Sequence, residues 1–212
     1  MRISDTGLVF DSATVDGPLR VCSFCSLLQR ENGTLLVSFR RGSSKDSDDG
    51  NVVICESTDH GNTWSVISEG FESSFEDLPG EIRSTELAEL DGGRLLAIQG
   101  WVDRSGGSGG LRNAETDTIV TMHLLQDFST DGGRSWGDRR VLKRNAVLSG
   151  PVLRLPGRGW LATSEFSHEI GRAHSELQSL VKLVCRLLLK KKKKNRHTDT
   201  ITTGSEDMSP LS

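Results

Sequence analysis

An eight-residue pattern, Ser-x-Asp-x-Gly-x-[Thr/Ser]-Trp, occurs twice in the chain and constrains its fold more than any other feature. The copies occupy residues 57–64 and 129–136, and each follows an apolar run. Asp and Ser side chains accept hydrogen bonds from nearby backbone N–H groups, and glycine adopts positive φ without steric cost. The closing tryptophan is large enough to pin a hairpin. The pattern therefore predicts two equivalent turns in which Asp59 and Asp131 are structural, and it disfavours a catalytic role for them.

A second repeat places glycine-centred hairpins between short apolar segments, around Gly33, Gly93 and Gly159. Between successive hairpins comes another predicted strand pair, in which residues 52–55 and 118–125 lead into the two Ser-Asp motifs. Each unit thus offers about four short strands, which is the content of one propeller blade. Helical periodicity is almost absent from these units. The sequence predicts an all-β fold with blades arranged radially.

Bulk composition excludes several classes of protein. The 212 residues suit one ordinary domain or part of a large one. The net charge of −3 predicts neither a nucleic-acid partner nor an anionic membrane partner. The first residues lack the basic start and apolar core of a signal peptide. The localisation stays unknown, and it is cytoplasmic if Met1 is the true start.

The four cysteines do not form a recognisable framework. Cys22 and Cys25 have CxxC spacing, but Cys55 and Cys185 supply no second pair at the spacing of a zinc site. We interpret them as small apolar residues on strands, with a metal or redox site as the alternative. We expect no metal and no cofactor.

The repeated motifs resemble the Asp boxes, or bacterial neuraminidase repeats, of the sialidase superfamily. The segment Gly-Thr-Leu-Leu at residues 33–36 is similar to the family's first hairpin. Sialidase propellers have six blades, so the resemblance implies a partial six-bladed β-propeller of four-stranded blades. It covers two blades and the opening hairpin of a third, within residues 1–168. We expect this to be about the first half of a domain, unable to close by itself.

The last segment, residues 169–212, changes character abruptly. Back-translation of its first part resembles a sequencing adapter, and the five consecutive lysines at 190–194 would correspond to a run of adenines. We interpret the segment as an unrelated tail produced by read-through. The alternative is a genuine basic tail, with the lysine run as a nuclear-import patch.

The resemblance also implies roles for residues of the first blade. Residues 19–22 stand where the family has Tyr-Arg-Ile-Pro and keep its arginine. Arg20 would belong to the arginine triad that holds the carboxylate of sialic acid, because a guanidinium can bind a carboxylate in bidentate fashion. Asp46 would be the general acid/base that protonates the leaving oxygen and later activates water. Arg41 would line the same pocket.

Other assignments remain open at this stage. Asp48 and Asp49 align with the catalytic position as well as Asp46 does, and all three also suit a solvated loop or a calcium loop that lacks its closing Glu. Glu81 and Arg83 open the inner strand of the second blade, and Arg83 is a further predicted substrate-binding residue. Glu81 and Glu115 are second-tier candidates of the same standing. Arg20 has the alternative of a surface strand residue.

One absence limits the predicted chemistry. Family sialidases use a tyrosine nucleophile assisted by a Glu, and the chain contains no tyrosine. The sequence therefore predicts a fragment of a sialidase-like glycoside hydrolase, of the class that removes terminal sialic acid with retention, which is inactive as given. The expected partner is a sialoglycan or another carbohydrate. The alternatives are a non-catalytic Asp-box propeller that binds its partner, and a sialidase-fold hydrolase of another substrate.

Overall fold

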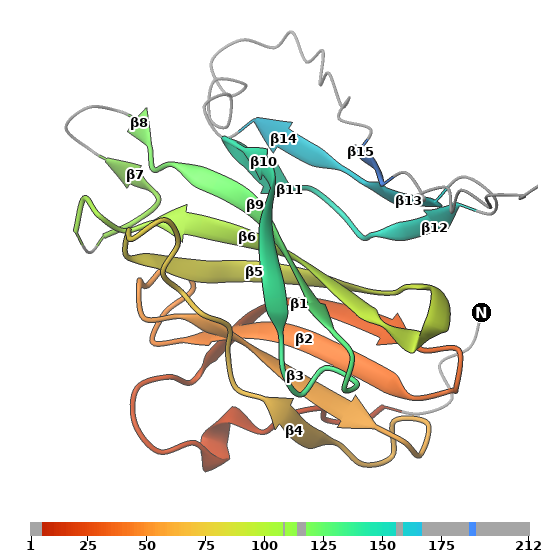
Figure 1. Ribbon diagram of the computed structural model, residues 1–212. Coiled ribbons are helices and arrows are strands. Elements are labelled where there is room, and N and C mark those ends of the chain that lie inside the picture. The colour runs from red at the N-terminus through yellow and green to blue at the C-terminus, as the bar shows by residue number, and fades with distance from the viewer. Residues whose placement is uncertain (1–5, 108, 114–117, 156–158, 167–186, 190–212) are drawn as a thin grey trace, which may run out of the picture.

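The computed structural model describes most of the first 166 residues as strands and turns (Figure 1). The described residues are 6–107, 109–113, 118–155, 159–166 and 187–189. Two single 3-10 turns, η1 (Ser12–Thr14) and η2 (Asp91–Gly93), are the helical elements of this part of the chain. Within it we find no helix long and apolar enough to cross a membrane. The all-β class predicted from the sequence is confirmed.

Two four-stranded antiparallel sheets follow each other along the chain. The strands of the first are β1 (Val21–Gln29), β2 (Leu35–Gly42), β3 (Asn51–Ser57) and β4 (Ser65–Ser68), in that order. The strands of the second are β5 (Gly80–Glu89), β6 (Leu95–Asp103), β9 (Met122–Ser129) and β10 (Gly137–Arg144), with β5 at one edge and β10 at the other. Four strands per unit is what the repeat predicts.

The strand predicted over 118–125 is wrong at its start. Residues Thr118–Ile119 form a separate short strand, β8, which pairs with β7 (Arg112–Asn113), and β9 begins only at Met122. The third unit begins with β11 (Ala146–Leu148), β12 (Leu153–Leu155), β13 (Gly159–Ala162) and β14 (Ser164–Phe166). Its predicted hairpin is present, because β12 pairs with β13. Strand β15 (Leu187–Leu189) also pairs with β13, and the rest of the predicted tail lies outside the described residues.

The sheets stack face to face, and the main core lies between them (Figure 1). Leu36 and Ile54 of the first sheet pack there with Ile82, Trp101 and Leu125 of the second. Each sheet carries a further apolar cluster on its far face. A sheet that is apolar on both faces must be covered on both, so this is the pattern of successive blades. The described residues do not close a ring.

The two edge strands β1 and β5 lie beside each other where the sheets meet (Figure 1). Both are irregular: the register of β1 shifts between Ser23 and Ser26, and that of β5 shifts between Ile82 and Ser84. A β-bulge of this kind re-aims the side chains of the bulged residues.

The two Ser-Asp turns, residues 57–64 and 129–136, connect the third strand of each sheet to the fourth. In the first turn, Ser57 Oγ donates to Asp59 Oδ1 at 2.8 Å and accepts from the Gly61 N–H at 2.8 Å. Asp59 also accepts from the N–H and the hydroxyl of Thr63, at 2.9 and 2.6 Å. The Trp64 Nε1–H closes the turn on the Gly61 carbonyl at 3.1 Å.

The second turn repeats these bonds one for one. Ser129 Oγ accepts from the Gly133 N–H at 2.9 Å, Asp131 accepts from the Ser135 N–H at 3.0 Å, and Trp136 Nε1–H donates to the Gly133 carbonyl at 3.0 Å. The hydrogen bonds from Thr63 and then Ser57 lower the pKa of Asp59 to about 2, and those from Ser135 and Ser129 hold the pKa of Asp131 well below its usual range. The prediction that both aspartates form turns is confirmed.

Candidate functional site

Asp46 and Arg83, predicted from different units, meet in the structure. Asp46 lies in the loop between β2 and β3, and Arg83 lies in the bulge of β5. Arg83 Nη2 donates to Asp46 Oδ1 and forms an ion pair with it. The Arg83 side chain is 12% exposed, whereas that of Asp46 is 51% exposed. The pair therefore has a mostly covered cation and an accessible carboxylate.

Glu81 is the centre of the charges beneath this pair. It is fully buried, and its Oε1 lies 3.1 Å from Arg104 Nη2 and 3.5 Å from Arg83 Nη1. Its Oε2 lies 3.4 Å from Arg40 Nη2. Three guanidinium groups thus converge on one buried carboxylate, and the Asp46 carboxylate adds a second at the surface. We call Arg40, Asp46, Glu81, Arg83 and Arg104 the Glu81 cluster.

Arg40 ties the loop of Asp46 to this cluster. Its Nη1 donates to the Ser44 carbonyl at 2.8 Å, and its Nη2 donates to the Ser47 carbonyl, so the loop wraps around the guanidinium. Gly42 and Gly50 border it so closely that a Cβ on either would overlap the Arg40 side chain. Local backbone acceptors and a distant Glu therefore fix the position from which Asp46 extends.

The cluster is positively charged and incompletely satisfied. It holds three arginines against two carboxylates, and the buried Nε atoms of Arg40 and Arg104 donate no hydrogen bond within the described residues. A buried excess of cations is costly unless it is paired. The accessible end of the cluster, at Arg83, is consequently suited to an anionic group of a ligand.

The hydrogen bond from Arg83, followed by other nearby cations, holds the pKa of Asp46 below its usual range. Without a ligand, Asp46 is thus a carboxylate. The two other alignable aspartates lie exposed in the same loop, and Asp49 Oδ1 accepts from the Ser43 N–H of that loop at 3.0 Å. Of the three, the structure brings Asp46 to Arg83.

Arg20 and Arg41 lie elsewhere. Arg20 is exposed, and its Nε donates to the Val15 carbonyl at 3.0 Å. The Arg41 guanidinium lies over the Phe10 ring, 5.7 Å from its centroid. Neighbouring residues on a strand point to opposite faces, so Arg40 enters the cluster and Arg41 does not. The roles predicted for Arg20 and Arg41 stay predictions, and Glu115 lies outside the described residues.

Sequence reasoning missed Arg40 and Arg104 as members of the cluster. Arg40 ends an apolar run beside a second arginine, and nothing in the pattern tells the two apart. Arg104 directly follows β6, in a Gly-rich segment whose sequence is typical of an ordinary loop. Arg40 and Arg104 share one feature that could have indicated their role, which is an arginine at the end of a buried strand.

The three cysteines among the described residues are free thiols. Cys22 and Cys25 lie on β1, as predicted, but they are exposed rather than buried, and Cys55 is a buried thiol of β3. Burial raises the pKa of Cys55 to about 11, so its thiol stays protonated at neutral pH. Over the described part of the chain, no group of three or more His, Cys, Asp or Glu side chains is placed to hold a metal ion.

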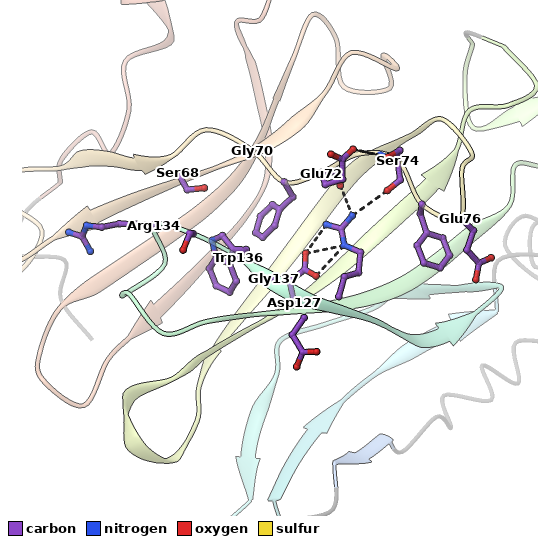
Figure 2. A pocket seen from close by; sticks show the side chains of 14 residues that line it. Ser68, Gly70, Glu72, Ser74, Glu76, Asp127, Arg134, Trp136 and Gly137 are labelled. Carbon is purple, nitrogen blue, oxygen red and sulfur yellow. Dashed lines mark hydrogen bonds and ion pairs between the residues drawn. The ribbon is translucent and has the colours of Figure 1, made fainter.

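A cavity of about 560 Å³ lies between the β4–β5 connection and β10 (Figure 2). Its charged side chains are bound to one another or to near neighbours. Arg139 binds Asp127 at 2.7 Å and the Glu72 carbonyl at 2.6 Å, while Glu76 pairs with Arg144. These bonds join the two walls of the cavity. We interpret it as a cross-linked joint between the sheets, distinct from the Glu81 cluster.

Comparisons with known proteins give a limited result. No protein-family model and no curated protein matches the sequence. Among solved structures, the chain is similar to an α-L-arabinofuranosidase of Fusarium graminearum complexed with arabinobiose, with 16% identity over 70% of this chain and 41% of that one, at a TM-score of 0.47. An α-L-arabinanase of Penicillium chrysogenum gives 16% identity over 70% and 42%, at 0.43.

A third similar structure is a Hadza microbial sialidase, with 15% identity over 66% of this chain and 30% of that one, at a TM-score of 0.38. The chain thus spans 30–42% of the length of these three proteins. Because the TM-scores are below 0.5, the fold class rests on the strand order described above.

Proposed function

We propose that the chain is part of a sialidase-like glycoside hydrolase propeller and that it contributes the acid/base side of a site for terminal sialic acid. The observation that carries the proposal is the Asp46–Arg83 pair, a half-exposed carboxylate bound to an arginine of a cationic cluster. The repeated four-stranded sheets with identical Ser-Asp turns supply the propeller context. A carboxylate that exchanges protons beside an anion-binding arginine is the combination that acidic sugars require.

The ion pair between Asp46 and Arg83 suggests how binding of the sugar leads to protonation of Asp46. A general acid must be protonated before it acts, yet Arg83 favours the ionised form of Asp46 and lowers its pKa. When the carboxylate of an acidic sugar takes over the hydrogen bonds of Arg83, Asp46 loses that stabilisation and its pKa rises. Asp46 can then take up a proton from solvent and give it to the glycosidic oxygen as a nucleophile from outside residues 1–212 bonds the anomeric carbon and the C–O bond breaks. Water later displaces that nucleophile and gives a proton to Asp46.

A non-catalytic binding module is the second candidate. It is favoured by Arg20, which the structure leaves at the surface, bound to the Val15 carbonyl. The same Arg83 would then hold an acidic sugar without chemistry. For both candidates we expect residues 1–212 to release no product from a fluorogenic sialoside.

Binding of sugars to the 212-residue chain tests the proposal. N-acetylneuraminic acid and arabinobiose are titrated separately against the protein, with NMR chemical shifts as the readout. We expect the acidic sugar to bind in preference to the neutral one. Arg83→Ala should weaken its binding at least about tenfold, the effect of losing one charge-assisted hydrogen bond. Arg140→Ala is the matched control, because Arg140 also pairs with an exposed aspartate, Asp138.

The other outcomes are equally decisive. Stronger binding of arabinobiose, unaffected by Arg83→Ala, would contradict a site for sialic acid and would favour a hydrolase of another substrate. Absence of binding by either sugar would overturn it. Turnover of the sialoside by the wild-type chain would show that a nucleophile other than tyrosine acts, and would exclude the binding module.

A further inference from the structure

Phe24 has a backbone conformation that its residue type disfavours. Its φ is 54°, in the left-handed region, where a Cβ is crowded and glycine is the usual residue. It lies in the bulge of β1, between the paired residues Ser23 and Ser26. Such strain persists only where the surrounding structure imposes it, and it gathers at functional sites.

The two bulges of the edge strands aim at each other. The guanidinium of Arg83, in the bulge of β5, lies 4.9 Å from the centroid of the Phe24 ring. Lys45 directly precedes Asp46 in the chain, and its Nζ atom lies 5.9 Å from the centroid of the Phe24 ring. Phe24, Lys45, Asp46 and Arg83 therefore come together from three segments of the chain at the accessible end of the Glu81 cluster.

Packing of the core does not account for this position. Phe24 is 38% exposed and belongs to none of the core clusters formed by the described residues. Leu27, farther along β1, is 65% exposed and lines an apolar hollow with Leu8 and Phe10 instead. A strained backbone that presents an aromatic ring to solvent, beside two cations and a carboxylate, has the make-up of a ligand contact.

We propose that Phe24 is a ligand-contacting residue, an aromatic platform on which the apolar face of an acidic sugar packs while its charged group meets Arg83 and Lys45. The proposal rests on the proposed function and adds a residue that selects the ligand. The ring supplies the apolar contact, and the Arg83 and Lys45 cations that lie over it favour a sugar that carries a carboxylate over a neutral one. The exposed Lys45 side chain is free to move aside or to bind the carboxylate as the sugar enters.

Replacing Phe24 by glycine separates the ring from the strain. Glycine accepts the left-handed backbone, so Phe24→Gly should fold with a thermal midpoint no lower than that of the wild type. Its affinity for N-acetylneuraminic acid should fall about tenfold or more, because the aromatic contact is lost. Phe24→Leu should bind with intermediate affinity. Leu27→Ala, on the same strand, is the control and should bind like the wild type.

Nuclear Overhauser contacts between the Phe24 ring protons and the C–H groups of the bound sugar distinguish a ligand contact from a residue that only orients Arg83. We expect such contacts. If Phe24→Gly binds like the wild type while Arg83→Ala does not, the inference is wrong and the proposed function stands. If the wild-type chain binds no sugar, the proposed function is wrong, and the inference about Phe24 is wrong with it. Should Phe24→Gly unfold, wild-type binding by Phe24→Leu would overturn the inference.

Discussion

The two Ser-Asp turns and the Glu81 cluster use the same side-chain chemistry in opposite ways. Asp59 and Asp131 accept every hydrogen bond described above from residues within four positions in the chain. Asp46 is bound by Arg83, which lies 37 positions away. Both carboxylate oxygens of Asp59 and of Asp131 are engaged inside the turn, whereas Arg83 binds Asp46 through Oδ1. Local saturation thus marks a structural aspartate, and a single distant partner marks a candidate functional one.

The largest expected effect comes from removing the carboxylate that holds the cluster together. Glu81→Ala leaves three arginines without their shared partner, two of them almost fully buried, and should lower the free energy of unfolding by about 3–5 kcal/mol. Urea denaturation measures the change. Glu31→Ala removes an exposed carboxylate paired with Arg154 and is the matched control. A loss below about 1 kcal/mol for Glu81→Ala would contradict the proposed role of Glu81.

The turns should respond next, and equally. Ser57 and Ser129 are 1% and 2% exposed, and each bonds an aspartate and a glycine N–H. Ser57→Ala and Ser129→Ala should each cost about 2 kcal/mol of unfolding free energy, because each removes a buried hydroxyl that bonds a carboxylate and a backbone N–H. The double variant should show the sum, since the two turns share no partner. Unequal losses would show that the turns are not equivalent.

Acid should weaken the turns. The folded pKa of Asp59 is about 2, below the ordinary value of 3.8, so its contribution to stability is complete above about pH 4 and is lost as the pH falls toward 2. Asp131 shifts in the same direction. The thermal midpoint should therefore drop through this window, and Asp59→Asn should flatten part of the drop. A midpoint of the wild type that is unchanged between pH 4 and pH 2 would exclude the mechanism.

The smallest change in stability is expected at Asp46. Its ion pair with Arg83 is half exposed, so Asp46→Asn should change the unfolding free energy by less than about 1 kcal/mol. In the wild type with labelled aspartate, N-acetylneuraminic acid should shift the carboxyl signal of Asp46, and the absence of that signal from Asp46→Asn assigns it. A destabilisation as large as that of Glu81→Ala would show that Asp46 is a structural residue, and its proposed difference from Asp59 and Asp131 would be wrong.

Sequence reasoning succeeded where the cause of structure is local. Glycine at Gly33 and Gly93, and the Ser, Asp and Trp of the turns, act on residues within a few positions, so their patterns predict hairpins and strand number. The Glu81 cluster depends on two bulges and on the packing of β5 against the first sheet. The bulges bring Phe24 to Arg83, and no pattern along the chain predicts them. Alternation along β2 separates Arg40 from Arg41, but it does not say which face of β2 meets β5.

The glycines around Arg40 have a consequence for reading natural variants of this chain. Gly50→Ala adds a single uncharged methyl group, and a substitution table would rank it as mild. At this position the methyl would occupy the space of the Arg40 guanidinium, which is buried and bound to the Ser44 and Ser47 carbonyls. The side chain could yield only by leaving Glu81. A change that is conservative in composition would therefore behave like the loss of a charge.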